Sequence, residues 1–89
     1  MSLRKISLET KAFEDLLYWL RNDRKSLERI MDLIDEIQRS PFDGKGKPEL
    51  LRHNLKGQWA RRITEEHRLV YRVSEDEITI LSCRFHYQK

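Results

Sequence analysis

Five arginines lie in the last third of this 89-residue chain, at Arg61, Arg62, Arg68, Arg72 and Arg84. A guanidinium binds phosphate oxygens through paired hydrogen bonds, so arginines gathered on one face would bind a polyanion. Alternation along a strand places Arg68 and Arg72 on one face, and we expect Arg84 to lie there too. The adjacent Arg61 and Arg62 must point to opposite faces, so one of them can join. Solvated strand arginines without a ligand would give the same pattern, and the residues alone leave both interpretations open.

Two further groups could move protons beside such a face. His86 ends an expected strand on the arginine side, and an imidazole can donate or accept a proton near neutral pH. Glu49 lies in a lysine-rich loop, where nearby cations favour the charged carboxylate. The ordinary alternatives are a structural histidine and a weak surface ion pair. His67, in an expected turn, fits a surface or orienting role, and His53 fits either kind of role.

A base at Glu49, an acid at His86 and arginines between them would form a site that cleaves RNA without a metal. RNA supplies its own nucleophile, the 2′-OH, so the protein must remove that proton, stabilise the phosphate charge and protonate the leaving 5′-oxygen. One cysteine and three scattered histidines match no zinc motif, and residues 44–47 lack the context of a phosphate-binding loop. We therefore expect no metal site and no cofactor.

Two amphipathic helices are expected in the first half, after a short strand within residues 2–8. The first has Thr10 as its N-cap, and the second begins at the cap Asp23 and ends at Ser40-Pro41. The apolar stripes at helical spacing are Phe13, Leu16, Leu17 and Leu20 in the first helix, and Leu27, Ile30, Met31, Ile34 and Ile37 in the second. A break this short between them predicts a helical hairpin.

The second half predicts a loop over residues 42–50 and then three strands, at 58–64, 68–73 and 78–87. In the middle strand Leu69, Tyr71 and Val73 share one face, and in the last strand Leu81, Cys83 and Phe85 do. We therefore expect an α+β domain, with two N-terminal helices packed on one face of a small antiparallel sheet. The tryptophans Trp19 and Trp59 fit core or interface positions.

The composition fits one small domain spanning residues 1–89. Residues 1–41 hold eight basic and eight acidic side chains, so the net charge of +3 arises in residues 42–89. The longest apolar run is far shorter than the roughly 20 residues of a membrane span. No apolar leader follows the N-terminus, and a single cysteine fits a reducing compartment. We expect a cytoplasmic protein.

Three runs of residues resemble the YoeB/Txe branch of the RelE toxin superfamily. They are PFDGKGKPE at 41–49, RRITEEHRLVY at 61–71 and CRFHY at 83–87, and the likeness extends over essentially the whole chain. The resemblance implies a toxin of a type II toxin–antitoxin system, with a microbial ribonuclease-like fold. It implies a metal-independent endoribonuclease that cuts mRNA in the ribosomal A site and is neutralised by a YefM-type antitoxin. A monomer or a homodimer fits this branch.

The same resemblance assigns roles to individual positions. Glu49 corresponds to the general base, His86 to the general acid, Arg68 to the phosphate-stabilising arginine and Tyr87 to a tyrosine that shapes the site. The supporting RNA-binding positions are Lys47, Arg52 and Arg62. The chain departs from the family pattern at Arg52, where the family has lysine, and in extending past Tyr87 by Gln88-Lys89. A non-catalytic toxin of the RelE/ParE fold and a plain ribosome- or RNA-binding module remain the alternatives.

Overall fold

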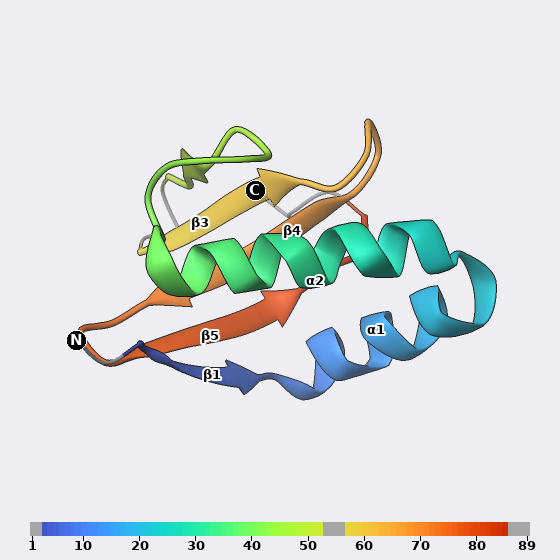
Figure 1. Cartoon of the computed structure of the whole chain (residues 1–89), viewed down its shortest axis with the longest axis horizontal. Helices are drawn as coiled ribbons and strands as arrows, with labels where there is room; N and C mark the ends of the chain where they lie inside the picture. Colours follow the sequence, from blue (N-terminus) through green and yellow to red (C-terminus); the bar gives the residue numbers. More distant parts are fainter. Residues whose placement is uncertain (1–2, 53–56, 86–89) are drawn as a thin grey trace.

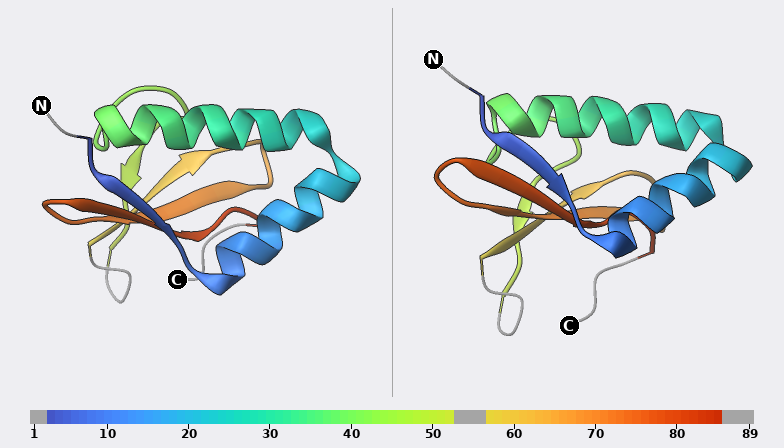
Figure 2. Two further views of the ribbon diagram at one scale, coloured as in Figure 1. Left: turned by 60° about the horizontal axis from the view of Figure 1, so that its bottom comes forward. Right: turned by 90° about the horizontal axis from the view of Figure 1, so that it is seen from below.

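The computed structural model describes residues 3–52 and 57–85. The elements in chain order are β1 (Lys5–Leu8), α1 (Thr10–Asn22), α2 (Arg24–Arg39), β2 (Glu49–Leu50), β3 (Gln58–Arg62), β4 (Arg68–Val73) and β5 (Glu77–Ser82). The five strands form one sheet in the order β1-β5-β4-β3-β2. Both helices lie on the same side of this sheet (Figures 1 and 2). The predicted α+β architecture is confirmed.

The sheet is antiparallel except at one edge. β1 pairs in parallel with β5, with Ile6 opposite Ile78 and Leu8 opposite Ile80. A parallel pair needs a long crossover, and here the two helices and three strands lie between the partners. The β1 strand predicted within residues 2–8 is confirmed, and the parallel pairing is a feature that its sequence pattern did not predict.

The two helix starts differ in how they are capped. Asp23 caps α2 as predicted, because its carboxylate accepts a hydrogen bond from the Ser26 N–H. Thr10 is not the cap of α1; it is the first helical residue, and Glu9 is the N-cap without a side-chain hydrogen bond. The chain enters α1 directly from β1, so sheet pairing sets the helix start. α2 ends at Arg39, before Ser40-Pro41, as predicted.

The predicted apolar face of α1 is wrong except at Leu16, which is partly buried and packs against the core. Phe13 and Leu20 are 52% and 41% exposed, whereas Ala12, Asp15 and Trp19 are buried. The helix is therefore rotated by about one residue, or roughly 100°, from the expected face. The small Ala12 allows α1 to approach Cys83 closely, and this contact selects the buried face.

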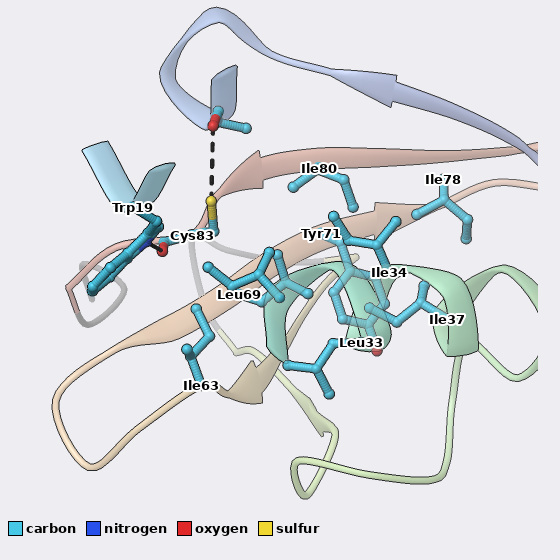
Figure 3. Packing of buried hydrophobic residues seen from close by; sticks show 12 residues of the cluster. Trp19, Leu33, Ile34, Ile37, Ile63, Leu69, Tyr71, Ile78, Ile80 and Cys83 are labelled. Atoms are coloured by element: carbon cyan, nitrogen blue, oxygen red, sulfur yellow. Dashed lines mark hydrogen bonds between the residues drawn. The ribbon is translucent and has the colours of Figure 1, made fainter. Parts of the chain in front are cut away.

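The second helix follows its predicted pattern more closely. Ile30, Ile34 and Ile37 are buried together with Leu33, while Met31 is about half exposed. The four buried residues pack against the core-facing side chains of the sheet, which include Leu69, Tyr71, Ile78 and Ile80 (Figure 3). Within the described ranges, 3–52 and 57–85, no helix is long and apolar enough to cross a bilayer.

Three strand predictions need correction. β3 ends at Arg62 instead of Thr64, and β5 covers Glu77–Ser82 instead of 78–87. The predicted loop 42–50 contains the short strand β2 at its end, because Glu49 and Leu50 pair with β3. β4 matches residues 68–73 as predicted.

The face predicted for the last strand is also wrong. A register shift between β4 and β5 falls at Val70/Tyr71, and Leu81 packs with Val70 on the face away from the helices. Cys83 follows the strand and is buried in the main core, while Phe85 is 54% exposed. A strand that ends at Ser82 no longer alternates, so the three residues do not share a face.

Candidate functional site

The sheet face opposite the helices carries Glu49 and three of the five arginines. Glu49 lies opposite Ala60, and Ala60 lies opposite Val70, so the three side chains share this face. Directly opposed residues in an antiparallel pair have Cβ atoms about 4.5–5.5 Å apart. The same face carries a small apolar cluster of Leu51, Ala60 and Val70, with Leu81 packed against it. We call this surface the open face.

Two arginines lie directly opposite each other on the open face. The register pairs Arg62 of β3, two residues after Ala60, with Arg68 of β4, two residues before Val70. Like charges placed directly opposite destabilise a sheet. An anion bound at both guanidinium groups would remove that repulsion.

Arg68 is held in place by its own turn. One of its guanidinium nitrogens donates to the carbonyl oxygens of Thr64, Glu65 and His67, at 2.8, 3.1 and 3.1 Å. These bonds hold the half-buried arginine beside the turn that joins β3 to β4. Arg62 is exposed, and so is Arg72, which shares the face of Arg68.

Arg84 does not lie on the open face, contrary to the sequence prediction. Its guanidinium carbon lies over the ring of Tyr18 on α1, 3.4 Å from the ring centroid. The same carbon lies 4.4 Å from the centroid of the Phe85 ring. Arg84 lies beyond the end of β5, where strand alternation no longer sets its direction.

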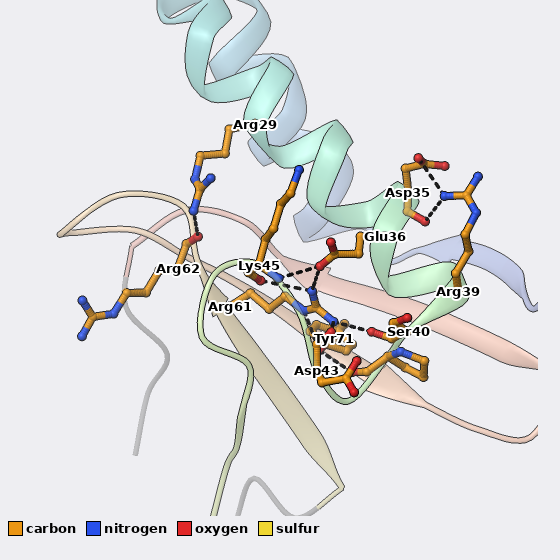
Figure 4. Close-up of polar contacts among 11 residues, drawn as sticks. Arg29, Asp35, Glu36, Arg39, Ser40, Asp43, Lys45, Arg61, Arg62 and Tyr71 are labelled. Carbon is orange, nitrogen blue, oxygen red and sulfur yellow. Dashed lines mark hydrogen bonds and ion pairs between the residues drawn. The ribbon is translucent and has the colours of Figure 1, made fainter.

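Arg61 points into the core, so Arg62 is the member of the pair that reaches the open face, as the alternation required. Arg61 is fully buried and pairs with Glu36 of α2 at 2.6 Å. Its other bonds run to the Tyr71 hydroxyl and to carbonyl oxygens in the chain after α2, at Ser40, Asp43 and Lys45. Figure 4 shows this network, which we call the Arg61 hub.

The Arg61 hub shapes the loop that leads to Glu49. The Tyr71 hydroxyl donates to the Pro41 carbonyl at 2.7 Å, and the Lys45 N–H donates to Glu36. The hydrogen bond from the Lys45 N–H and, to a smaller extent, the Arg61 guanidinium lower the pKa of the Glu36 carboxyl. Burial raises the pKa of the Tyr71 hydroxyl. An ionised Glu36 and a neutral Tyr71 are the states that the hub needs.

Backbone geometry requires glycine where this loop approaches β3. Gly46 has φ +83°, and an added Cβ would meet the Arg61 Cβ and the Arg62 carbonyl at 3.1 Å. The Gly46 carbonyl accepts the Arg62 N–H at 2.7 Å, which fixes the loop against β3. Lys47, the next residue, also has a positive φ of 52° and is exposed.

The remaining predicted site residues divide into described and undescribed ones. Glu49 and Arg52 are exposed, at the first residue of β2 and just after the buried Leu51. His53, His86 and Tyr87 lie outside the described residues. Among residues 3–52 and 57–85, no three His, Cys, Asp or Glu side chains lie together as a metal site.

Sequence reasoning missed Arg61 as a residue that positions the loop. The signal was present, because two adjacent strand arginines point to opposite faces. One of them must then be buried in the core, and a buried guanidinium needs a carboxylate and carbonyl acceptors. Glu36, on the second predicted helix, was the partner to seek.

Comparison with solved structures identifies the class of fold. YafQ from Escherichia coli matches with a TM-score of 0.73 at 16% identity, covering 93% of each chain. At this identity the match concerns the fold alone, and it shows that the chain has a RelE-like α+β fold.

The family follows from closer matches. Residues 8–87 match the family model described as YoeB-like toxin of bacterial type II toxin–antitoxin systems, and the chain belongs to this family. Toxin YoeB of Escherichia coli is 51% identical over 83 residues, covering 93% of this chain and 99% of the relative. Toxin RelK of Mycobacterium tuberculosis is 54% identical over 85 residues, covering 96% and 100%.

A solved structure within the family agrees with this assignment. The YoeB dimer from Staphylococcus aureus has a TM-score of 0.88 to this chain at 44% identity, covering 97% of this chain and 100% of that one. YoeB–YefM complexes from the same organism have also been solved, and one of them has a TM-score of 0.85 at 44% identity, with the same coverage. The predicted resemblance to YoeB toxins is confirmed.

Proposed function

We propose that the chain is a ribosome-dependent endoribonuclease toxin that cuts mRNA and stops translation. The observation that carries the proposal is the opposed pair Arg62 and Arg68 on the same face as Glu49. A phosphodiester held at the two guanidinium groups would lie beside a carboxylate on the neighbouring strand. Membership in the YoeB-like toxin family supports the same conclusion.

The proposed reaction needs no metal. The Glu49 carboxylate takes the proton of the 2′-OH, and the 2′-oxygen forms a bond to the adjacent phosphorus. Arg68, aided by Arg62, stabilises the charge that develops on the phosphate oxygens. The bond from phosphorus to the 5′-oxygen breaks, and His86 gives that oxygen a proton. The products are a 2′,3′-cyclic phosphate and a 5′-OH.

The supporting residues bind the strand around the reacting phosphate. Lys47 and Arg52 are exposed at either end of the short segment that carries Glu49, where their charges favour an RNA backbone. Tyr87, by its match to the family motif, shapes the site. The ribosome with mRNA in its A site would be the partner that presents the substrate, which places the protein in the cytoplasm.

The proposed protein partner is a YefM-type antitoxin. YoeB–YefM complexes from Staphylococcus aureus have been solved, and so has a YoeB dimer from that organism. An antitoxin of this type would neutralise the toxin, and the free toxin would be a monomer or a homodimer.

Primer extension on mRNA in a translating extract tests the reaction. Wild-type protein should create new 5′ ends within codons at the A site. Glu49→Gln and His86→Gln should lower the cleavage rate by about a hundredfold to ten-thousandfold, because each removes one proton transfer. The matched control Glu75→Gln, in the exposed turn between β4 and β5, should cleave as wild type.

Two outcomes would overturn the proposal. Cleavage by both variants at the wild-type rate would reject the assigned acid and base. Translation arrest without new 5′ ends, or binding without products, would indicate a non-catalytic toxin or an RNA-binding module.

A further inference from the structure

The chain that follows β5 is held by side chains from α1. The Cys83 N–H donates to the Asp15 carboxylate at 2.9 Å, and the Cys83 carbonyl accepts from the Trp19 indole at 2.7 Å. Both bonds are buried, and Asp15 is only 3% exposed. A buried carboxylate on a core helix normally requires such a partner. The start of this segment, Cys83–Phe85, is therefore fixed to α1.

The end of the same segment is held by the turn between β3 and β4. The Phe85 N–H donates to Nδ1 of His67 at 2.7 Å, and the Phe85 carbonyl accepts from the Arg68 N–H at 3.0 Å. The His67 ring lies edge-on to the Trp19 ring, with centroids 4.8 Å apart. The centroids of the His67 and Phe85 rings are 5.6 Å apart. His67 thus connects the core helix, the turn of Arg68 and the C-terminal segment.

Phe85 adopts a backbone conformation that needs outside support. Its φ of 64° lies in the left-handed region, which side chains with a Cβ disfavour. Such a conformation persists where the surroundings determine it, and it is enriched at functional sites. Its side chain is more than half exposed, so burial of the phenyl ring is a weak constraint. Two hydrogen bonds fix its N–H and its carbonyl, and ring contacts with Arg84 and His67 add to them.

We propose that His67 is a positioning residue whose Nδ1 fixes the exit of the C-terminal segment beside Arg68. An imidazole that accepts at Nδ1 is neutral and carries its proton on Nε2. His86, the proposed acid, follows Phe85 directly in the sequence. His67 therefore fixes the backbone residue from which the chain continues to His86. This role rests on the proposed function for His86, whereas the bond from Phe85 to His67 stands independently of it.

Two substitutions separate the acceptor of His67 from its ring. His67→Asn keeps an oxygen acceptor close to the position of Nδ1 and loses the ring. His67→Phe keeps a ring against Trp19 and Phe85 and loses the acceptor. If His67 positions the segment, the Phe variant should lose about tenfold to a hundredfold in kcat with little change in KM. The Asn variant should retain most of kcat.

A role in packing alone predicts the reverse order. The Phe variant would then keep its activity, and the Asn variant, which leaves a gap beside Trp19, would lose both activity and stability. Thermal unfolding of both variants identifies any loss of activity that follows from unfolding. Equal kcat in the Phe variant and the wild type would overturn the proposal.

Nuclear magnetic resonance tests the contact without any cleavage assay. In the wild type the imidazole nitrogens of His67 should give the signature of a proton on Nε2, and the Phe85 amide proton should resonate downfield. In His67→Phe the Phe85 amide proton should move upfield and exchange faster with solvent, and in His67→Asn it should stay close to its wild-type position. Identical amide behaviour in all three proteins would reject the contact, even if RNA cleavage is demonstrated. Wild type that cleaves no RNA but passes this test would reject the proposed function alone.

Discussion

Arg61 and Arg62 are adjacent in the chain but lie in opposite environments. Arg61 is fully buried and donates to a carboxylate, a hydroxyl and three carbonyl oxygens, whereas Arg62 faces solvent opposite Arg68. A lysine at 61 would offer fewer donors from a single nitrogen and could not make this planar set of bonds. At this scale the type of each side chain matters less than the face on which its strand places it.

Cys83 shows how burial controls the reactivity of a single residue. Its thiol is fully buried, and burial, followed by the nearby charge of Asp15, raises its pKa to about 12. The thiolate is the reactive form, so the folded protein should resist alkylation by iodoacetamide at pH 8. Mass spectrometry should detect labelling only after urea is added. Rapid labelling of the folded protein would contradict the buried position.

At the scale of elements, the loop after α2 has few apolar contacts, namely the buried Pro41 and the Phe42 ring packed against Trp59 of β3. Phe42 is about half exposed, and the chain is held to the sheet through the Arg61 hub and the Gly46–Arg62 backbone bond. Hydrogen bonds to buried groups are costly to remove because the remaining partner is left without water. The loop that carries Lys47 and precedes Glu49 therefore depends on the hub for its conformation.

Tyr71→Phe tests this dependence. The substitution removes the donor to the Pro41 carbonyl and the acceptor for Nε of Arg61. We expect the free energy of unfolding to fall by about 1–3 kcal/mol, measured by urea denaturation. The matched control Tyr18→Phe, on α1, should leave the loop unchanged. A Tyr71→Phe protein as stable as wild type would show that the hub does not hold the loop.

At the scale of the whole molecule, the position of the positive charge matters more than its total. The net charge is only +3, yet Arg62, Arg68 and Arg72 all lie on the open face. The helices cover the other face, and α1 and α2 together carry six basic and six acidic residues. A polyanion would therefore be attracted to one side of the protein.

Charge reversal on each side separates position from net charge. Arg72→Glu on the open face and Lys25→Glu on α2 change the total charge equally, and both residues are exposed. Arg72→Glu should weaken binding to an RNA oligonucleotide and reduce its salt dependence, while Lys25→Glu should change affinity by less than about twofold. Fluorescence polarisation at several salt concentrations measures both effects. Equal weakening by the two variants would indicate attraction by net charge alone.

Where a segment has a single hydrophobic periodicity, the sequence alone determined both the secondary-structure element and its buried face. α2 has a cap at Asp23 and a clear apolar stripe, and β4 alternates without interruption, so both were predicted with their faces. The arginine face of β4 followed from the same alternation, and the structure brings Glu49 and Arg62 to that face. The catalytic roles came from family motifs instead, and they remain proposals.

Tertiary contacts decided the features for which the sequence offered two patterns or none. α1 has two overlapping stripes, and docking of Ala12 and Trp19 at Cys83 selected the one that spacing did not favour. The parallel edge of the sheet, the direction of Arg84 and the Arg61 hub join residues far apart in the chain. Local periodicity reports which residues share a face, but the packing partner determines which face is buried. That choice depends on contacts which form only when the whole chain has folded.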